Sequence, residues 1–200
     1  MRVDTDFEPI ETERLLLRRS TVDDAEAIAA YRADPEVARY QGWDRVDLES
    51  VRTSMAEMAG RDPGEPGWVQ FSVEEQTTGR LVGDVGLSPD EEEPGVIKVG
   101  YTMAPRAQGK GYATEAVRAL VDYAFDTLGA DTVIAYASAE NLPSHRVAEK
   151  AGLRLVRRFE GRSDDGTTWR GVRYQLDHTD RPRPRPPGDG PTEDSIPREG

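Results

Sequence analysis

The strongest constraint on the fold is a single apolar stripe in the middle of the chain. Its members recur every three or four residues, the spacing of one face of an α-helix: Ala113, Ala116, Val117, Leu120, Val121, Ala124, Phe125 and Leu128. Gly129 directly after the stripe suits the end of such a helix. A helix with one continuous apolar face must bury it against another element, so the stripe predicts a layered domain.

Segments with strand character surround this helix. Alternating apolar and polar residues and β-branched residues predict strands at 14–19, 68–75, 80–87, 96–103, 132–137, 153–159 and 168–176. Further helices are predicted from the capping residues at 20–24 to a stop at Pro35, from Asp47 onward, and over 142–150. Strand and helix alternate in the middle and antiparallel hairpins flank them, which indicates a mixed-sheet α/β domain.

The end of the chain differs in composition from the rest. Proline alternates with arginine over 181–187, and proline removes backbone donors and fixes φ. The 200 residues are enough for one domain with a substantial core. We therefore expect a domain over residues 10–178 and a disordered Pro/Arg-rich tail over 179–200. Binding of a partner by this tail is an alternative to a tail without specific contacts.

Composition narrows the classes of function. The formal net charge is −12, which repels phosphate backbones, so no nucleic-acid partner is expected. The same charge attracts cationic molecules, or it only keeps the protein soluble. The chain has no cysteine and two histidines, which excludes thiolate and three-histidine metal sites, and we expect no metal. No apolar run approaches the length of about 18 residues that a membrane span needs, and the acidic N-terminus does not resemble a signal peptide. A cytoplasmic protein without a membrane partner is expected.

A glycine-rich segment, residues 108–114, lies between the strand that ends near Met103 and the striped helix. Glycine leaves room for close approach to backbone N–H groups, and a helix start adds unpaired donors and partial positive charge. Together these features suit a phosphate or pyrophosphate, with a cation from Lys110 or Arg106. An ordinary strand-to-helix turn is the alternative.

Two widespread phosphate-binding motifs do not match this spacing. The ATP-binding loop requires Ser or Thr after Gly-Lys, whereas Gly111 follows Gly109-Lys110. The dinucleotide fingerprint requires a third glycine or alanine where this chain has Thr114.

The segment instead resembles the signature of the GNAT N-acyltransferases, which Gln108, Gly111 and Ala113 satisfy. A second signature follows at the expected distance, with Asn141, Ser144 and then Glu-Lys-Ala-Gly-Leu over 149–153, and a third precedes it at 12–18. The resemblance spans about residues 10–176. It is to the branch of ribosomal-protein-alanine N-acetyltransferases and aminoglycoside 6′-N-acetyltransferases. It implies the GNAT fold, an α/β domain with a central mixed, mostly antiparallel sheet, splayed at the fourth and fifth strands and flanked by about four helices.

The resemblance also implies acetyl-CoA as the acyl donor and a place for it. Its pyrophosphate is expected on Gln108, Gly109, Lys110, Gly111, Tyr112 and Ala113. The pantetheine arm is expected along Tyr101, Thr102 and Met103, with contacts from Asn141 and Ser144. The family places a bulge on this strand, which Gly100 would accommodate. The backbone N–H near Met103 would polarise the thioester carbonyl.

Two positions depart from the family pattern, and both concern proton transfer. Many relatives have a glutamate base where this chain has Lys98, so Asp84 on the preceding strand is our candidate base. The alternatives are a structural role for Asp84, with water or backbone carbonyls accepting the proton. Many relatives have a tyrosine acid where this chain has Ala148. The resemblance to this branch instead implies the hydroxyl three residues after Asn141, so Ser144 is our candidate proton donor for the leaving thiolate. Its alternative role is to begin a helix.

Acceptor recognition is predicted between the first two helices, where the family builds its acceptor wall. The candidates are two aromatic residues for stacking and two acidic residues for a cation, namely Tyr40, Trp43, Glu36 and Asp44; burial in the core is the alternative for the aromatic pair. The predicted reaction is acetyl transfer to a primary amine by direct attack on the thioester. The acceptor is an aminoglycoside, a protein N-terminus or another small amine. A catalytically idle acyl-CoA-binding or sensor domain and a scaffold acting through the tail are the alternatives, and a homodimer is possible in this branch.

Overall fold

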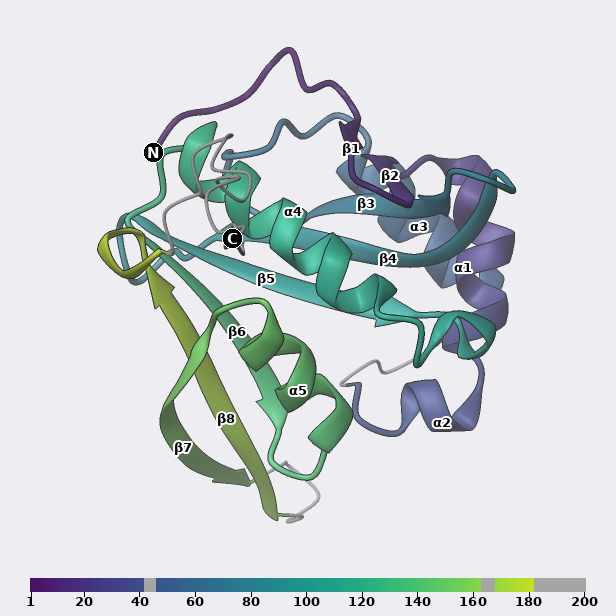
Figure 1. Ribbon diagram of the computed structural model, residues 1–200. Helices are drawn as coiled ribbons and strands as arrows, with labels where there is room; N and C mark the ends of the chain where they lie inside the picture. Colours follow the sequence, from purple (N-terminus) through teal and green to yellow (C-terminus); the bar gives the residue numbers. More distant parts are fainter. Residues whose placement is uncertain (42–45, 163–167, 182–200) are drawn as a thin grey trace, which may run out of the picture.

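The computed structural model describes residues 1–41, 46–162 and 168–181. Its strands form one sheet in the order β1-β2-β3-β4-β5-β6-β8-β7 (Figure 1). Their bounds are β1 (Ile10–Glu11), β2 (Leu15–Arg19), β3 (Val69–Glu75), β4 (Arg80–Pro89), β5 (Val96–Met103), β6 (Thr132–Ser138), β7 (Arg154–Arg162) and β8 (Thr168–Asp177). Neighbouring strands run antiparallel except β5 and β6, which run parallel. The mixed, mostly antiparallel α/β sheet predicted from the sequence is confirmed.

The sheet opens between β5 and β6. Their parallel pairing covers only Val96–Val99 of β5 against Thr132–Ala135 of β6. Beyond Val99, β5 continues beside β4 alone, while β6 continues beside β8. The two strands diverge visibly in Figure 1. Backbone groups of β5 from Gly100 to Met103 therefore face an opening on that side, as the splayed arrangement requires.

The described residues form five α-helices: α1 (Ala25–Arg32), α2 (Pro35–Ala38), α3 (Leu48–Met58), α4 (Tyr112–Asp126) and α5 (Leu142–Lys150). Figure 1 shows α4 crossing one face over β4 and β5, with α5 beside the opening. Helices α1 and α3 pack together on the other face, where α1 contacts β4 and α3 contacts β3. Among the described residues, none of these helices has the length and apolar character needed to cross a bilayer.

The apolar stripe forms the centre of the core, as its spacing predicts. Ala116, Leu120 and Ala124 of α4 are fully buried. Leu128 is also fully buried although α4 ends at Asp126, because the chain turns beneath the helix at Gly129. Burying an aliphatic side chain such as Leu120 contributes about 1.5–3 kcal/mol, so this helix is a major contributor to stability.

Three local expectations need correction. The bulge expected at Gly100 is absent, since β4 and β5 pair in unbroken register from Pro89↔Ile97 to Gly83↔Met103. Gly100 instead makes room for the Trp68 ring, which lies 3.0 Å from where its Cβ would be. Pro35 does not only end a helix; it begins the short α2, capped by Asp34. The two-residue β1 was not predicted because so short a strand has no readable period.

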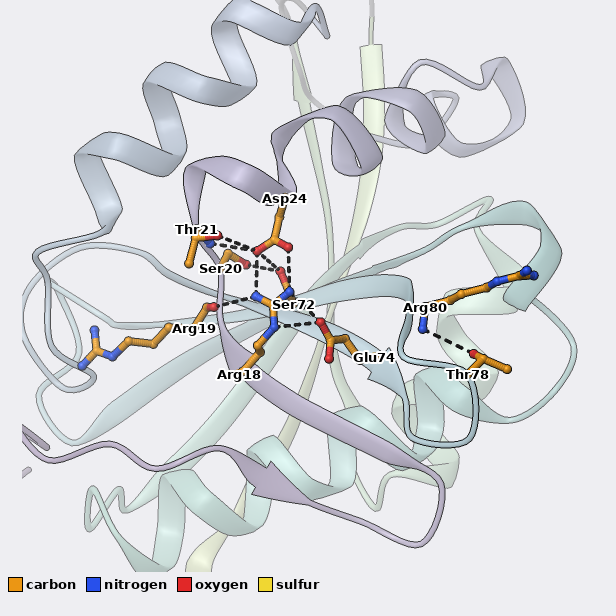
Figure 2. A network of polar contacts seen from close by, with 9 residues as sticks. All are labelled: Arg18, Arg19, Ser20, Thr21, Asp24, Ser72, Glu74, Thr78 and Arg80. Atoms are coloured by element: carbon orange, nitrogen blue, oxygen red, sulfur yellow. Dashed lines mark hydrogen bonds and ion pairs between the residues drawn. The ribbon is translucent and has the colours of Figure 1, made fainter.

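The face of the sheet under α1 is polar. Buried Ser72, Asp84 and Thr102 lie opposite one another in register on β3, β4 and β5. Figure 2 shows one part of this layer, where Arg18 of β2 forms a fork with the carboxylate of Asp24, at 2.7 and 2.8 Å. Ser72 donates to the same carboxylate at 2.9 Å. Satisfied hydrogen bonds make burial of these groups tolerable, because each one lost would cost about 1–3 kcal/mol.

Candidate active site

The glycine-rich segment forms a tight loop between β5 and α4. Gly109 and Gly111 have φ values of 76° and 85°, in the left-handed region that favours glycine. Gly111 is the N-cap of α4, whose first backbone N–H groups have no partner within the helix. Space around Gly109 is open, since a Cβ there would meet nothing within 4 Å. The loop thus offers backbone donors and room for an anion, which fits the pyrophosphate of acetyl-CoA.

Side chains attach this loop to the sheet. The Gln108 side-chain amide donates to the Met103 carbonyl at 3.2 Å, which returns the loop to the end of β5. The Tyr112 hydroxyl donates to Glu75 of β3. This hydrogen bond lowers the pKa of Glu75 and raises the pKa of Tyr112. Lys110 lies with its ammonium 5.9 Å from the centre of the Tyr112 ring.

The opening between β5 and β6 brings together two of the predicted residues. The Tyr101 hydroxyl on β5 lies 2.8 Å from the Ser144 hydroxyl and donates to the Ser144 carbonyl at 2.9 Å. Burial raises the pKa of Tyr101 to about 12, so the phenol keeps its proton at neutral pH. The sequence analysis predicted Tyr101 at this site because it lies on the strand expected to align the pantetheine arm. The contact of its phenol with Ser144 was not predicted.

The start of α5 explains how Ser144 is presented. Asn141 is the N-cap, and its side-chain oxygen accepts from the Ser144 backbone N–H at 3.2 Å. Ser144 is therefore not the capping residue, and its hydroxyl is directed to Tyr101 instead. His145 turns away, with its ring nitrogen 2.9 Å from the Ser138 carbonyl. Ala148, one turn later, is buried in the core, where a tyrosine would not fit without repacking.

Asp84 lies in a dense set of donors rather than in an open position. It is 2% exposed, and its carboxylate accepts from Arg32 at 2.7 Å and from Tyr31 and Gln70. Burial, followed by the charge of Asp84, raises the pKa of Tyr31. Burial lowers the pKa of Arg32, but Asp84 raises it more, and the net shift is upward. The lone pairs that a general base needs are occupied, and the arrangement joins α1 to β4.

Lys98 lies at the position where the family resemblance implies a glutamate base, and its side chain forms an ion pair. Its ammonium lies 3.6 Å from the carboxylate of Asp90, in the loop between β4 and β5. That loop is held a second time by Glu93, which pairs with Arg173 of β8. In the part of the chain that the structure describes, no three histidine, aspartate or glutamate side chains gather as metal ligands.

The predicted acceptor residues are only partly within the described structure. Glu36 lies on α2 with its side chain 83% exposed, and its carboxylate is 4.0 Å from Arg39. Tyr40 is half-buried, with the Arg39 guanidinium 5.3 Å from its ring centre, so it is not a core residue. Trp43 and Asp44 lie outside the described residues. The structure does not bring Glu36 or Tyr40 into contact with Ser144.

Comparisons with known proteins identify the family of this chain. Residues 14–154 match the model of the acetyltransferase (GNAT) domain. The uncharacterized N-acetyltransferase p20 of Bacillus licheniformis is 31% identical over 157 residues, covering 77% of this chain and 88% of that protein. The uncharacterized N-acetyltransferase YoaA of Bacillus subtilis is 30% identical, covering 74% and 83%.

Solved structures show the same architecture. A GNAT-family acetyltransferase from Bacillus anthracis superposes with a TM-score of 0.75 at 27% identity, covering 85% of this chain and 98% of the other. The ribosomal L7/L12 α-N-protein acetyltransferase RimL, solved with coenzyme A, has a TM-score of 0.72 at 15% identity, with coverage of 85% and 98%. At that identity the likeness to RimL concerns the fold alone. The matched domain and the relatives together show that this chain belongs to the GNAT family of N-acetyltransferases, enzymes that use acetyl-CoA.

Proposed function

We propose that this protein transfers the acetyl group of acetyl-CoA to a primary amine on a cationic small molecule or a peptide N-terminus. One observation carries the proposal: the opening beside β5 has the glycine loop at one end and the Tyr101–Ser144 pair on its wall. Acetyl-CoA supplies the activated thioester. The N–H groups from Gly109 to Ala113 hold its pyrophosphate, and the edge of β5 at 101–103, which β6 does not pair, aligns its pantetheine arm.

Ser144 is assigned the proton donation to the departing thiolate. The two hydroxyl oxygens lie 2.8 Å apart, and either hydroxyl can donate to the other. In the proposed step the Tyr101 O–H turns from the Ser144 carbonyl to the Ser144 hydroxyl oxygen, which leaves the serine proton for the sulfur. Because its pKa is about 12, Tyr101 holds this hydrogen bond throughout the neutral range. Asn141 fixes the first turn of α5 and so the position of the serine. The backbone N–H near Met103 would polarise the thioester carbonyl.

Proton acceptance from the amine is assigned to water at the opening. Asp84, our candidate base from the sequence, already accepts from three side chains and is buried. Accepting an ammonium proton there would require breaking a buried ion pair, which costs about 3–5 kcal/mol. In this proposal Asp84 is a structural residue.

The acceptor is proposed to approach from the side of α2. Glu36 offers an exposed carboxylate there and Tyr40 a half-buried ring. A carboxylate and an aromatic face both attract ammonium groups. The net charge of −12 acts in the same direction over longer distances.

The test is thiol release from acetyl-CoA with three acceptors: an aminoglycoside, a short peptide with an unblocked N-terminus, and a polyamine. We expect acceleration by at least one of them. Ser144→Ala should then lower kcat by about a hundredfold, the lower end of what a positioned acid contributes. Ser54→Ala, on the exposed surface of α3, is the matched control and should leave kcat unchanged.

Two results would contradict the proposal. Binding of acetyl-CoA without turnover of any of the three amines would favour the idle sensor domain. Turnover with an unchanged rate in Ser144→Ala would remove the serine from the mechanism while leaving the enzyme assignment intact.

A further inference from the structure

Five side-chain and backbone groups meet at the start of α4. The Glu115 carboxylate accepts from the Thr12 hydroxyl at 2.7 Å and from the Arg14 backbone N–H at 2.9 Å. The Arg14 guanidinium grips the same carboxylate through Nε at 2.7 Å and Nη2 at 2.6 Å. Its third nitrogen, Nη1, donates to the Lys110 carbonyl at 3.0 Å. Arg14 thus joins the segment before β2 to both α4 and the glycine loop.

The contact with Lys110 determines how the loop presents its donors. In a planar trans peptide the C=O and the following N–H point in opposite directions. Since Arg14 holds the Lys110 carbonyl on its own side, the N–H of Gly111 must point to the other side of the loop. The Arg14 guanidinium also lies 4.7 Å from the centre of the Tyr112 ring, so Arg14 contacts residues on both sides of Gly111.

The contact with Glu115 determines the local charge. A carboxylate in the first turn of a helix opposes the binding of an anion at that helix end, because it cancels the partial positive charge there. Burial raises the pKa of Glu115, but the bonds from Thr12 and Arg14 lower it more, so the carboxylate is charged at neutral pH. The guanidinium balances this charge in a two-pronged pair.

We infer that Arg14 and Glu115 form a clamp, built from two segments far apart in the sequence, that orients the Lys110–Gly111 peptide and neutralises the helix start so that the loop binds the pyrophosphate of acetyl-CoA. The inference rests on the proposed function. Arg14 and Glu115 are positioning residues, because they act through the loop. Thr12 supports the clamp by fixing Glu115.

The experiment compares two ligands: coenzyme A, which carries the pyrophosphate, and pantetheine, which does not. Kd is measured for Arg14→Gln, Glu115→Gln and the double variant, by calorimetry for coenzyme A and by competition for pantetheine. Arg154→Gln is the matched control, since Arg154 also pairs with two carboxylates but lies on β7, in contact with Asp177 and Asp180.

Arg14→Gln should raise the Kd of coenzyme A about tenfold, the loss expected when an oriented donor to an anion is misdirected. The Kd of pantetheine should not change, and kcat at saturating acetyl-CoA should stay near that of the unchanged protein while KM rises. The double variant should recover part of the affinity for coenzyme A, because the uncompensated Glu115 charge is gone. A residue with only a structural role would show neither the ligand selectivity nor the recovery.

Three results would each overturn the inference. They are equally weakened binding of coenzyme A and pantetheine, an unchanged affinity for coenzyme A, and no recovery of that affinity in the double variant. If Arg14→Gln does not fold, Arg14→Lys replaces it; a lysine keeps the charge but cannot bridge Glu115 and Lys110 together, so a smaller increase in Kd is expected. Failure of the unchanged protein to bind coenzyme A would instead refute the proposed function, so the two failures are distinguishable.

Discussion

At the scale of single residues, two hydroxyl groups link the two elements that border the opening of the sheet. Tyr101 comes from β5 and Ser144 from α5, and their oxygens lie 2.8 Å apart. The tyrosine expected from relatives at position 148 is replaced by a buried alanine. A phenol is nevertheless present at the site, and it reaches Ser144 from the strand.

Replacing Tyr101 by phenylalanine tests this link. The variant keeps the ring and its packing but removes the oxygen that orients Ser144, so kcat should fall about tenfold, within the effect of one hydrogen bond to a reacting group. The measurement is kcat for Tyr101→Phe, Ser144→Ala and the double variant. Because the two residues act as a unit, the double variant should be no slower than Ser144→Ala; additive losses would show that they act independently.

Asp84 gives the second prediction at this scale. Asp84→Asn removes the charge that pairs with buried Arg32, and breaking a buried pair costs about 3–5 kcal/mol. The free energy of unfolding in urea should fall by about that amount, while exposed Asp23→Asn should change it little. At a temperature where the variant stays folded, kcat should remain within a few-fold of normal, whereas loss of a general base would cost about a hundredfold or more.

At the scale of elements, buried charge joins β2, β3 and the 3₁₀ turn before α1. Arg18 of β2 contacts Asp24 of that turn and Glu74 of β3 at the same time (Figure 2). Ser20 and Ser72 complete the set, 2.9 Å apart. The set spans β2, β3 and the 3₁₀ turn, so the network fixes how α1 begins over the sheet.

This network predicts how stability depends on pH. Burial raises the pKa of Asp24, but the bonds from Arg18, Thr21 and Ser72 lower it more, so its folded pKa lies below the ordinary value of 3.8. As the pH falls past 3.8, Asp24 binds a proton in the unfolded state but not yet in the folded state. The free energy of unfolding therefore falls until Asp24 is protonated in the folded state as well. Unfolding free energy measured in urea from pH 6 to pH 3 should show this fall. Asp24→Asn should be less stable at pH 6 and show a shallower fall; an equal slope would remove Asp24 as its source.

At the scale of the whole molecule, the last residue that the structure describes lies beside α4, the helix on which the core depends. Arg181, the last described residue, pairs with Asp122 at 2.8 Å and with Asp126 of α4. The domain predicted to end at 178 therefore has described contacts up to Arg181. Both aspartates are more than half exposed, so solvent screens these pairs and their contribution is at most about 1 kcal/mol.

Two truncations distinguish this contact from a function of the tail. Removing residues 182–200 should leave kcat and the melting temperature unchanged. Removing 179–200 also deletes Arg181 and should lower the melting temperature by a few degrees, with kcat unchanged. If removal of residues 182–200 abolished activity while circular dichroism showed an intact fold, the scaffold hypothesis would be favoured over the enzyme.

Local patterns predicted most of the fold because they depend on neighbours in the sequence. The stripe of α4, the helix start at Asp47 and the alternation along β3 are short-range signals, and the elements lie where they indicate. The bulge at Gly100 was wrong because only the structure shows that the glycine accommodates the Trp68 ring. Asp84 was a plausible base as a lone carboxylate on a strand, and the three donors around it come from α1 and β3.

The sequence by itself determined the class of the domain and the place of the glycine loop, since helical period and turn chemistry are properties of the chain. It also predicted, through the family resemblance, that Ser144 and Tyr101 contribute to one cofactor site. Only the tertiary structure decided which groups touch. The Tyr101–Ser144 contact joins residues 43 positions apart, and the ion pair of Arg14 with Glu115 joins residues 101 positions apart. Such contacts are set by how the elements pack on a common core, which no local pattern encodes.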